Sequence, residues 1–536
     1  MDYLAFVLLL PFVLASIYVL AYDLRAWKSG SPRLPPGPKP FPIIGNILDL
    51  VGNQPHRAVS KLSKTYGPLM TLKLGSMTTI IISSPDLAKQ VLQKYDHVFS
   101  GRTILDAIRA LNHHKFSMGW LHPTSSRWRN LRKVSAMQIF APQRLDSIQA
   151  IRRKKVQQLV DHVKEICNSG QEVDIGGATF TTSLNAISNT LFSKDLADYC
   201  STASQEFQEI ILGTMEEAGR PNVADYFPAL RFVDPQGARR RMKIYFRNCF
   251  RTLDGIINER LQLRASSSKG SKASSDVLDS LLDLTQEDDS ELSLDDIRHL
   301  LLDLFIAGID TTSSTVEWAM AELLRNPEKM AKARKELEEV LGKDEHVQES
   351  DISKLPYLRA IVKETFCLHP PVPLLAPHKA EIDKEVCGFT LPKNAQILVN
   401  VWAMGRDSSI WPNPNLFVPE RFLEKNIDFK GIDFELIPFG AGRRICPGLP
   451  LANRMVHLML ASLVHYFNWN LADEMEAKDL NMSETFGFTL HKAEPLRAIP
   501  IRFGLRSTSF GMVLLLMPRE WLPMSRIEFA SDKSVL

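Results

Sequence analysis

One cysteine in the sequence lies among glycines and arginines, in the stretch FGAGRRICPG at residues 439–448. A thiol reacts or binds metal as its thiolate, and nearby cations and helix N-termini lower its pKa. Arg443 and Arg444 supply the cations, and an apolar helical pattern begins directly after Gly448. We therefore predict a lowered pKa for Cys446, which would act as a thiolate.

The sequence around this thiol also suits a flat partner. Gly440, Gly442 and Gly448 let the backbone turn tightly and approach such a group, and Phe439 can pack against it. A nucleophilic cysteine is the alternative, but it needs a general-base histidine that the sequence does not single out. A dinucleotide loop is disfavoured because Ile445 replaces its third glycine. Thiolate-ligated iron fits best, and in haem proteins this ligation favours O–O cleavage.

A long helix is predicted upstream, from Ser293 to the stop signal at Asn326-Pro327. Ser293 followed by Asp296 three positions later is typical of a capping box. At the centre, the segment AGIDTT at residues 307–312 interrupts the apolar run with small, acidic and hydroxyl side chains, which form helix poorly.

Two interpretations of this central segment stay open from the residues alone. Asp310 and Thr311 can lie on a solvated face, with Gly308 allowing close packing. Alternatively, the small residues admit a planar ligand, and the Thr311 hydroxyl opens the helix to a polar groove in which protons pass from Asp310.

Composition favours a large globular protein and excludes some partners. Of the 536 residues, 45% are hydrophobic and 23% are charged, which allows a large buried core. A net charge of +3 without a long Lys/Arg block predicts no nucleic-acid partner. The six cysteines are at least twenty positions apart, so neither a structural zinc site nor a small disulfide framework is expected.

The N-terminus predicts a membrane anchor. No charge occurs from Tyr3 to Tyr22, and a helix of this length spans about 30 Å, one hydrocarbon thickness. A cleaved signal peptide is the alternative, but Asp2 stands where a basic region is expected. Basic residues follow the span, so the rest of the chain is expected to face the cytosol. We expect a single transmembrane helix over residues 1–24.

A basic, proline-rich hinge is expected over residues 25–45, because PRLPPGPKPFP suits neither a helix nor a central strand. The globular domain is then expected over residues 46–503. Helical patterns dominate it, with strand-like runs at Leu69–Ser83 and Ala395–Met404.

The stretch at 439–448 matches the pattern F-x-x-G-x-R-x-C-x-G, so the sequence resembles the cytochrome P450 family. The likeness extends from the anchor to about Phe503, with four further motifs in the family's order. It implies the mainly α cytochrome P450 fold with small β-sheets, and a haem b cofactor. It also implies that Cys446 is the axial ligand of the haem iron and that Arg444 binds a haem propionate.

Other motifs have implied roles by the same resemblance. AGIDTT corresponds to the family's oxygen-activation helix, which implies that Thr311 and Asp310 deliver protons to bound dioxygen. WRNLR implies propionate contacts from Trp128 and Arg132, and APHKAE implies one from His378.

One motif departs from the family pattern. The E-x-x-R motif reads ETFC, from Glu364 to Cys367, with cysteine in place of the arginine that bridges the glutamate and the PERF segment. That segment here contains Glu420 and Arg421. A thiol has neither the charge nor the donor geometry of arginine. We predict impaired folding or haem retention, since losing one member of a buried ion pair costs about 3–5 kcal/mol.

The alternative for this departure is that Arg421 or a water compensates for the missing arginine. Cys367 would then pack as a small buried hydrophobic residue.

Within the family, IPFGAGRRICPGLPLA and NVWAMGRD resemble the plant microsomal branch, and especially monoterpenoid hydroxylases of the geraniol 8-hydroxylase type. This implies a substrate pocket formed by Ala107, Leu304, Ala307, Val372, Leu374 and Phe488. Such a pocket offers few groups to fix a charged ligand, so a lipophilic substrate is expected, such as a monoterpene alcohol.

The resemblance implies a single-pass monooxygenase of the endoplasmic reticulum membrane, in contact with lipid and with its catalytic domain facing the cytosol. One oxygen atom of dioxygen enters a C–H bond, and NADPH-cytochrome P450 reductase supplies the electrons. The alternative is a membrane-anchored haem-binding or haem-poor protein in which Cys367 prevents turnover. Residues 504–536 lie beyond the part of the chain that matches the family pattern. They are expected to form a disordered or loosely packed tail.

Overall fold

The computed structural model describes residues 33–51, 54–199, 201–266, 276–286, 292–342, 346–472 and 475–502. The anchor expected at 1–24 and the tail expected at 504–536 lie outside these residues. Among the residues described, no helix is both long enough and apolar enough to cross a membrane.

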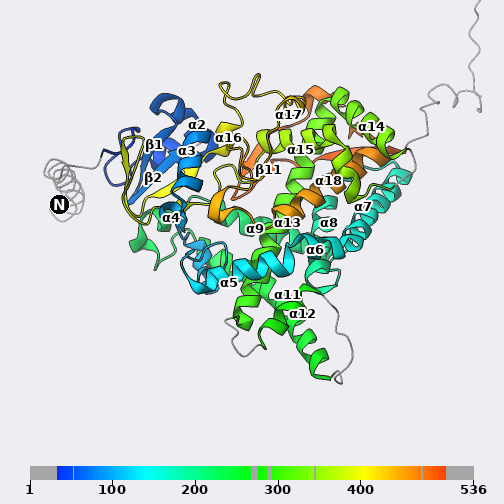
Figure 1. Ribbon diagram of the computed structural model, residues 1–536, viewed down its shortest axis with the longest axis horizontal. Coiled ribbons are helices and arrows are strands. Elements are labelled where there is room, and N and C mark those ends of the chain that lie inside the picture. The colour runs from blue at the N-terminus through cyan, green and yellow to red at the C-terminus, as the bar shows by residue number, and fades with distance from the viewer. Residues whose placement is uncertain are drawn as a thin grey trace, which may run out of the picture.

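Helices dominate the described chain, and the strands form small sheets, which confirms the mainly α prediction (Figure 1). The α-helices are α2 Pro55–Tyr66, α3 Pro85–Lys89, α4 Asp96–Phe99, α5 Ser126–Val134, α6 Pro142–Ser147, α7 Gln149–Ser169, α8 Ile175–Phe192, α9 Thr202–Gly219, α10 Val223–Tyr226, α11 Ala238–Ser266, α12 Val277–Leu284, α13 Leu294–Arg325, α14 Pro327–Leu341, α15 Pro356–Leu368, α16 Val401–Met404, α17 Arg421–Glu424 and α18 Leu449–Tyr466. The strands are β1 Leu69–Leu74, β2 Met77–Ile82, β3 Gly101–Arg102, β4 Val173–Asp174, β5 His378–Lys379, β6 Lys384–Val386, β7 Phe389–Leu391, β8 Gln396–Val399, β9 Phe467–Leu471, β10 Glu484–Phe486, β11 Leu490–Lys492 and β12 Arg497–Arg502.

The largest sheet has the strand order β1-β2-β8-β5-β3 and lies at one side of the molecule, near α2, α3 and α16 (Figure 1). The strand-like run from Leu69 to Ser83 is confirmed as the antiparallel hairpin β1–β2, and β2 pairs with β8 in parallel. Only the first half of the second strand-like run, Ala395–Met404, forms a strand, β8. The Asn400 side chain accepts a hydrogen bond from the Ala403 N–H at 3.0 Å and caps α16, so the chain turns into a helix after β8.

Helix α13 crosses the middle of the molecule and packs against α8, α11 and α18 (Figure 1). Its predicted start is confirmed, because Ser293 and Asp296 form both hydrogen bonds of a capping box. Asn326 is its C-cap, as the stop signal predicted. Most side chains of α13 are buried, so this helix is the core element on which a central site can be built.

The described part of the expected hinge, residues 33–45, is attached to the edge of the large sheet. Pro36 O accepts a hydrogen bond from the Thr71 N–H at 2.8 Å, and Ile44 O accepts one from the Gly75 N–H at 3.1 Å. A Cβ atom on Gly37 would lie 1.9 Å from Thr71 O, so only glycine allows this close approach.

Candidate active site

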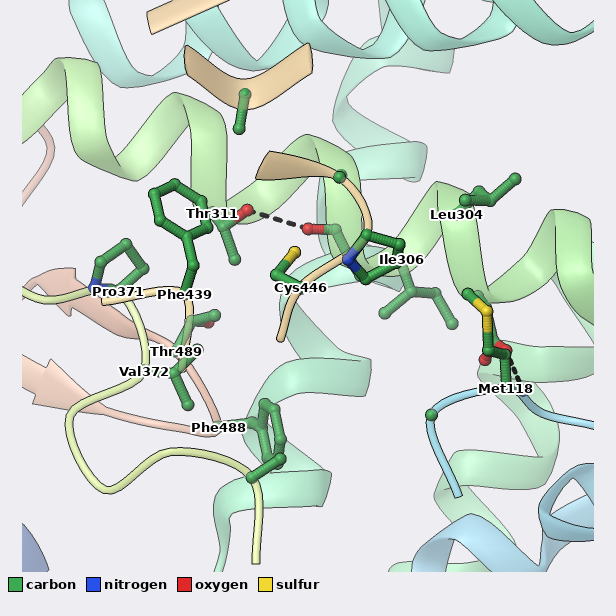
Figure 2. A pocket seen from close by; sticks show the side chains of 18 of the residues that line it. Met118, Leu304, Ile306, Thr311, Pro371, Val372, Phe439, Cys446, Phe488 and Thr489 are labelled. Carbon is green, nitrogen blue, oxygen red and sulfur yellow. Dashed lines mark hydrogen bonds between the residues drawn. The ribbon is translucent and has the colours of Figure 1, made fainter. Parts of the chain in front are cut away.

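A cavity of about 370 Å³ lies between the middle of α13 and the loop at 438–448 that contains Cys446 (Figure 2). Further walls come from α8, α9, the turn after α15 and the β10–β11 hairpin. In Figure 2, Cys446 and Thr311 lie in the middle of the view, with Val372 and Phe488 toward one side and Leu304 toward the other. The lining is mostly apolar.

Four of the six residues predicted to line the substrate pocket border this cavity: Leu304, Ala307, Val372 and Phe488. The other two, Ala107 and Leu374, do not border it, contrary to the prediction. Ala107 is 2% exposed and packs in the main core, while its neighbour Ile108 borders the cavity. Leu374 packs against side chains of β1 and β2, while Leu375 borders the cavity.

The thiol of Cys446 borders the cavity beside Phe439, whose carbonyl accepts the Cys446 N–H at 3.0 Å. Burial raises the pKa of this thiol, and hydrogen bonds from the Gly448 and Leu449 N–H groups, together with the charge of Arg132, offset only part of the effect. The predicted lowering of the pKa is therefore wrong for the protein alone. A bound metal deprotonates a coordinating thiol by its own charge.

The cations expected to activate Cys446 have other partners. Arg443 forms an exposed ion pair with Asp96, with Nε and Oδ2 3.2 Å apart. Arg444 turns toward backbone carbonyls and lies over the Trp128 ring, 5.0 Å from its centroid.

Three arginines border the cavity without a countercharge. Arg102, Arg132 and Arg444 form no ion pair with any carboxylate of the described residues. Burial lowers the pKa of Arg102 to about 10. Burial, together with the positive charges of Arg102 and Arg132, lowers the pKa of Arg444 to about 8. Guanidinium groups gathered in this way provide a binding site for an anionic group.

Backbone carbonyls hold these guanidinium groups in place. Arg102 Nη1 donates to Ala376 O at 2.6 Å, Arg132 Nη2 donates to Ile445 O at 2.5 Å, and Arg444 Nε donates to Ser100 O at 2.9 Å. Arg102 Nε is buried and has no hydrogen-bond partner in the structure. Donors therefore remain for a ligand. Arg102 was not predicted from the sequence, where no motif marks it.

Trp128 and His378 also border the cavity, but their ring N–H groups are engaged. Trp128 Nε1 donates to Met118 O at 3.1 Å, and His378 Nδ1 lies 2.8 Å from Phe99 O. Burial and the charges of Arg102 and Arg444 keep the pKa of His378 well below its usual range. The positive charge at this end of the cavity therefore comes from the arginines.

The glycines of the cysteine loop have different surroundings. Gly440, with a φ of 70°, and Gly448 border the cavity. Gly442 does not, although it was expected to bind the cofactor. A Cβ atom on Gly442 would lie 1.8 Å from Leu92 O, so this glycine lets the loop pack against its neighbour.

Comparison with known proteins identifies the family. Residues 35–496 match the family model described as "Cytochrome P450". The chain belongs to the cytochrome P450 family. Cytochrome P450 76T24 of Catharanthus roseus is 54% identical over 501 residues, which cover 94% of this chain and 99% of that protein. Geraniol 8-hydroxylases of Catharanthus roseus and Swertia mussotii are 53% and 52% identical, over 93% and 89% of this chain and 99% and 95% of their own lengths.

Cytochrome P450 proteins bind haem b, and the residues around the cavity fit that group. The Cys446 thiol would bind the iron, and Arg102, Arg132 and Arg444 would bind the propionates. The apolar walls would cover the porphyrin. The unpaired positive charge among the arginines is the feature that calls for an anionic cofactor.

The solvated-face interpretation is wrong for Asp310, whose side chain is buried and only 1% exposed. The expected close packing of Gly308 is confirmed, because a Cβ atom there would lie 2.3 Å from Ile187 Cδ1. The Thr311 hydroxyl borders the cavity and donates to Ala307 O at 2.9 Å, while α13 continues as an α-helix through this point.

Asp310 does not border the cavity, but it is hydrogen-bonded to Thr489, which does. The Thr489 hydroxyl donates to Asp310 Oδ2 at 2.5 Å, and His491 Nε2 lies 3.3 Å from the same oxygen. Burial opposes protonation of His491, but the Asp310 carboxylate outweighs it and raises the pKa of His491. Thr489 and His491 were not predicted from the sequence, because they lie far from α13 in the chain.

The altered E-x-x-R motif lies in the core, and neither Glu364 nor Cys367 borders the cavity. Val418 N–H donates to Glu364 Oε1 at 2.9 Å, and Arg421 Nε lies 3.3 Å from Glu364 Oε2. The Arg421 donors are directed to backbone carbonyls instead, so Oε2 receives no hydrogen bond. Burial raises the pKa of Glu364 to about 7, although the charge of Arg421 opposes this.

Cys367 and Glu420 do not compensate for the missing arginine. Cys367 is 2% exposed, and its sulfur lies 3.5 Å from Gly405 O. Glu420 pairs with Lys329 and Lys332 at the surface. Arg421 therefore supplies a nearby charge to Glu364, as the tolerant alternative expected, but not the missing hydrogen bonds.

Replacing Arg444 with leucine is expected to lower the affinity for haem about tenfold to a hundredfold, because a hydrogen bond to a charged group contributes about 1.5–3 kcal/mol. The rate of haem transfer to a haem-free acceptor protein measures this loss. Arg443→Leu is the matched control, since Arg443 is an exposed neighbour paired with Asp96. Equal transfer rates for the two variants would contradict the proposed propionate contact.

Proposed function

We propose that this cytochrome P450 hydroxylates a small lipophilic terpenoid, such as a monoterpene alcohol, with dioxygen and electrons from NADPH-cytochrome P450 reductase. The apolar cavity between Cys446 and α13 is the observation on which the proposal rests. Relatives named geraniol 8-hydroxylase, at 53% and 52% identity over nearly the whole chain, support the substrate class.

Haem bound through Cys446 would supply the activation of dioxygen and its insertion into a C–H bond. The residues of the chain would bind the substrate and hold protons. The apolar side chains of Leu304, Ala307 and Phe488 exclude water from the substrate. Thr489 and Asp310 hold a proton between oxygens 2.5 Å apart at the cavity wall.

The proton held there would have a route to solvent through His491. The His491 side chain is 22% exposed, and its Nε2 lies 2.7 Å from Thr489 Oγ1. The neighbouring Thr311 hydroxyl, bonded to Ala307 O, presents its oxygen at the same wall.

Incubating the full chain and the reductase with NADPH and a panel of terpenoids is the direct test. We expect a hydroxylated product from at least one monoterpene alcohol, and its formation should require both NADPH and the reductase. Mass spectrometry of products formed under labelled dioxygen shows whether one atom is incorporated. Complete haem loading without any terpenoid product would contradict the proposed substrate class.

A second candidate function is favoured by the unbonded Glu364 Oε2, which indicates a weakened core. The protein would then bind haem poorly or without turnover. The spectrum of the reduced, carbon-monoxide-bound protein distinguishes the two. A thiolate-type Soret band supports the monooxygenase, whereas little haem or a histidine-type band supports the second candidate.

A further inference from the structure

A polar cluster borders the otherwise mostly apolar cavity, on the part of α13 that precedes Thr311. Asp303 of α13 is the only carboxylate among the described residues that border the cavity, and its side chain is 15% exposed. Neither the sequence motifs nor the proposed chemistry assigns it a role.

Protein donors satisfy most of this carboxylate. The Ser117 hydroxyl donates to Oδ1 at 2.7 Å, His113 Nε2 lies 3.1 Å from Oδ1, and the Met118 N–H donates to Oδ2 at 2.8 Å. An ionised carboxylate has about four acceptor positions, so one position remains on Oδ2. A buried acceptor gains from a ligand donor there, because water is largely excluded.

The imidazole rings behind Asp303 are fixed in place. His299 Nδ1 lies 2.8 Å from His113 Nδ1, and the His299 ring stacks on Phe116. Burial and the neighbouring His113 lower the pKa of His299 to about 3, so His299 is neutral. The carboxylate of Asp303 is therefore an acceptor held in place by a packed cluster.

The position of Asp303 on α13 determines how far a group bound there would lie from Thr311. It precedes Thr311 by eight residues, which corresponds to about 12 Å along a helix. The residues between them that border the cavity are mainly apolar: Leu304, Ile306, Ala307 and Gly308. A molecule held at Asp303 would lie along this apolar face, with its other end near Thr311 and Cys446.

We infer that Asp303 Oδ2 accepts a hydrogen bond from the hydroxyl group of an elongated lipophilic alcohol, so that oxidation falls on the end of the skeleton remote from that hydroxyl. This inference rests on the proposed function. The hydrogen bonds from Ser117 and Met118 show that Asp303 also holds the chain locally, and the two roles use different acceptor positions of one carboxylate.

The ligand-side test needs no variant. Dissociation constants of the haem-loaded protein are measured by calorimetry for geraniol, for its methyl ether and for the hydrocarbon that lacks the oxygen. The ether keeps the oxygen but cannot donate a proton. We expect geraniol to bind about tenfold more tightly than either analogue, the usual range for a hydrogen bond to a charged group. Equal binding of alcohol and ether would overturn the inference.

Two variants separate ligand binding from local structure. Asp303→Asn is expected to remove the preference for the alcohol and to leave the hydrocarbon affinity unchanged. Ser117→Ala, which loosens the cluster but keeps the carboxylate, is expected to retain the preference. Equal losses for alcohol and hydrocarbon in both variants would show that Asp303 is only structural, and would overturn the inference.

The remaining outcomes are also distinguishable. If the corresponding amine bound more tightly than geraniol and lost this advantage in Asp303→Asn, the site would select ammonium groups and the alcohol would be the wrong class. If terpenoids were hydroxylated with no dependence on Asp303, the inference alone would fail. If the haem-loaded protein bound none of the probes, the proposed function would fail with it.

Discussion

Replacing Cys446 with serine is expected to abolish both the thiolate-type spectrum of the carbon-monoxide-bound protein and all hydroxylation. The Cys446 thiol is the only cysteine sulfur among the described residues that border the cavity, so no other cysteine of that part of the chain is placed to bind the iron. A serine hydroxyl is a poor iron ligand and does not donate the electron density that favours O–O cleavage. Optical spectra of the purified variant and product analysis measure the two effects.

Cys387→Ser is the matched control for this substitution, because Cys387 is exposed and does not border the cavity. It should retain the spectrum and the activity of the natural chain. An unchanged spectrum in Cys446→Ser would mean that another group binds the iron, and would remove the basis of the proposed function.

Replacing Cys367 with arginine is expected to raise the free energy of unfolding by about 3 kcal/mol at neutral pH. The buried Glu364 has a pKa of about 7 rather than its usual 4.5, and a tenfold change in a proton-binding constant corresponds to about 1.4 kcal/mol. Arginine at position 367 lies three residues from Glu364 on α15 and can donate to the unbonded Oε2. Thermal unfolding temperature and haem content should both increase.

The raised pKa of Glu364 determines how the free energy of unfolding of the natural chain changes with pH. Because folding raises the pKa of Glu364, the folded chain binds more protons than the unfolded chain between about pH 4.5 and 7. The stabilising contribution of protonated Glu364 is complete below pH 4.5 and is lost as the pH rises through 7. In Cys367→Arg this loss should be much smaller, since the new cation favours the ionised carboxylate.

Two controls accompany this substitution. Cys367→Ala removes the thiol without adding charge and should show the pH dependence of the natural chain. Cys367→Lys adds the charge without the two-pronged donor geometry and should give an intermediate result. If arginine and alanine at position 367 gave the same stability at every pH, Arg421 would already compensate fully.

Local patterns predicted those parts of the protein whose determinants lie close together in the chain. The capping box at Ser293 and the helix start after Gly448 depend on a few neighbouring residues, and both occur in the structure. The strand-like run at Leu69–Ser83 likewise placed β1 and β2. In Ala395–Met404, the side chain of Asn400 overrode the strand pattern by capping a helix.

The parts that were missed depend on contacts between distant segments. Arg102, Thr489 and Asp303 meet the cavity from three regions of the chain, and none belongs to a motif that marks it. Ala107 and Leu374 were each one position from a residue that borders the cavity, because successive side chains along a chain point in different directions. The direction of the Cys446 pKa shift was wrong for a similar reason, since burial by remote segments exceeded the effect of neighbouring charges.

The attachment of residues 33–45 to the sheet shortens the tether of the domain. Pro36 is already bonded to β1, so from residue 33 onward the chain follows the domain surface. Were residues 1–24 to form the anchor, only residues 25–32 would remain between the two, and eight residues reach at most about 28 Å. The folded part would then be confined to a thin zone above the lipid. A substrate dissolved in the bilayer would have only a short aqueous path to the protein.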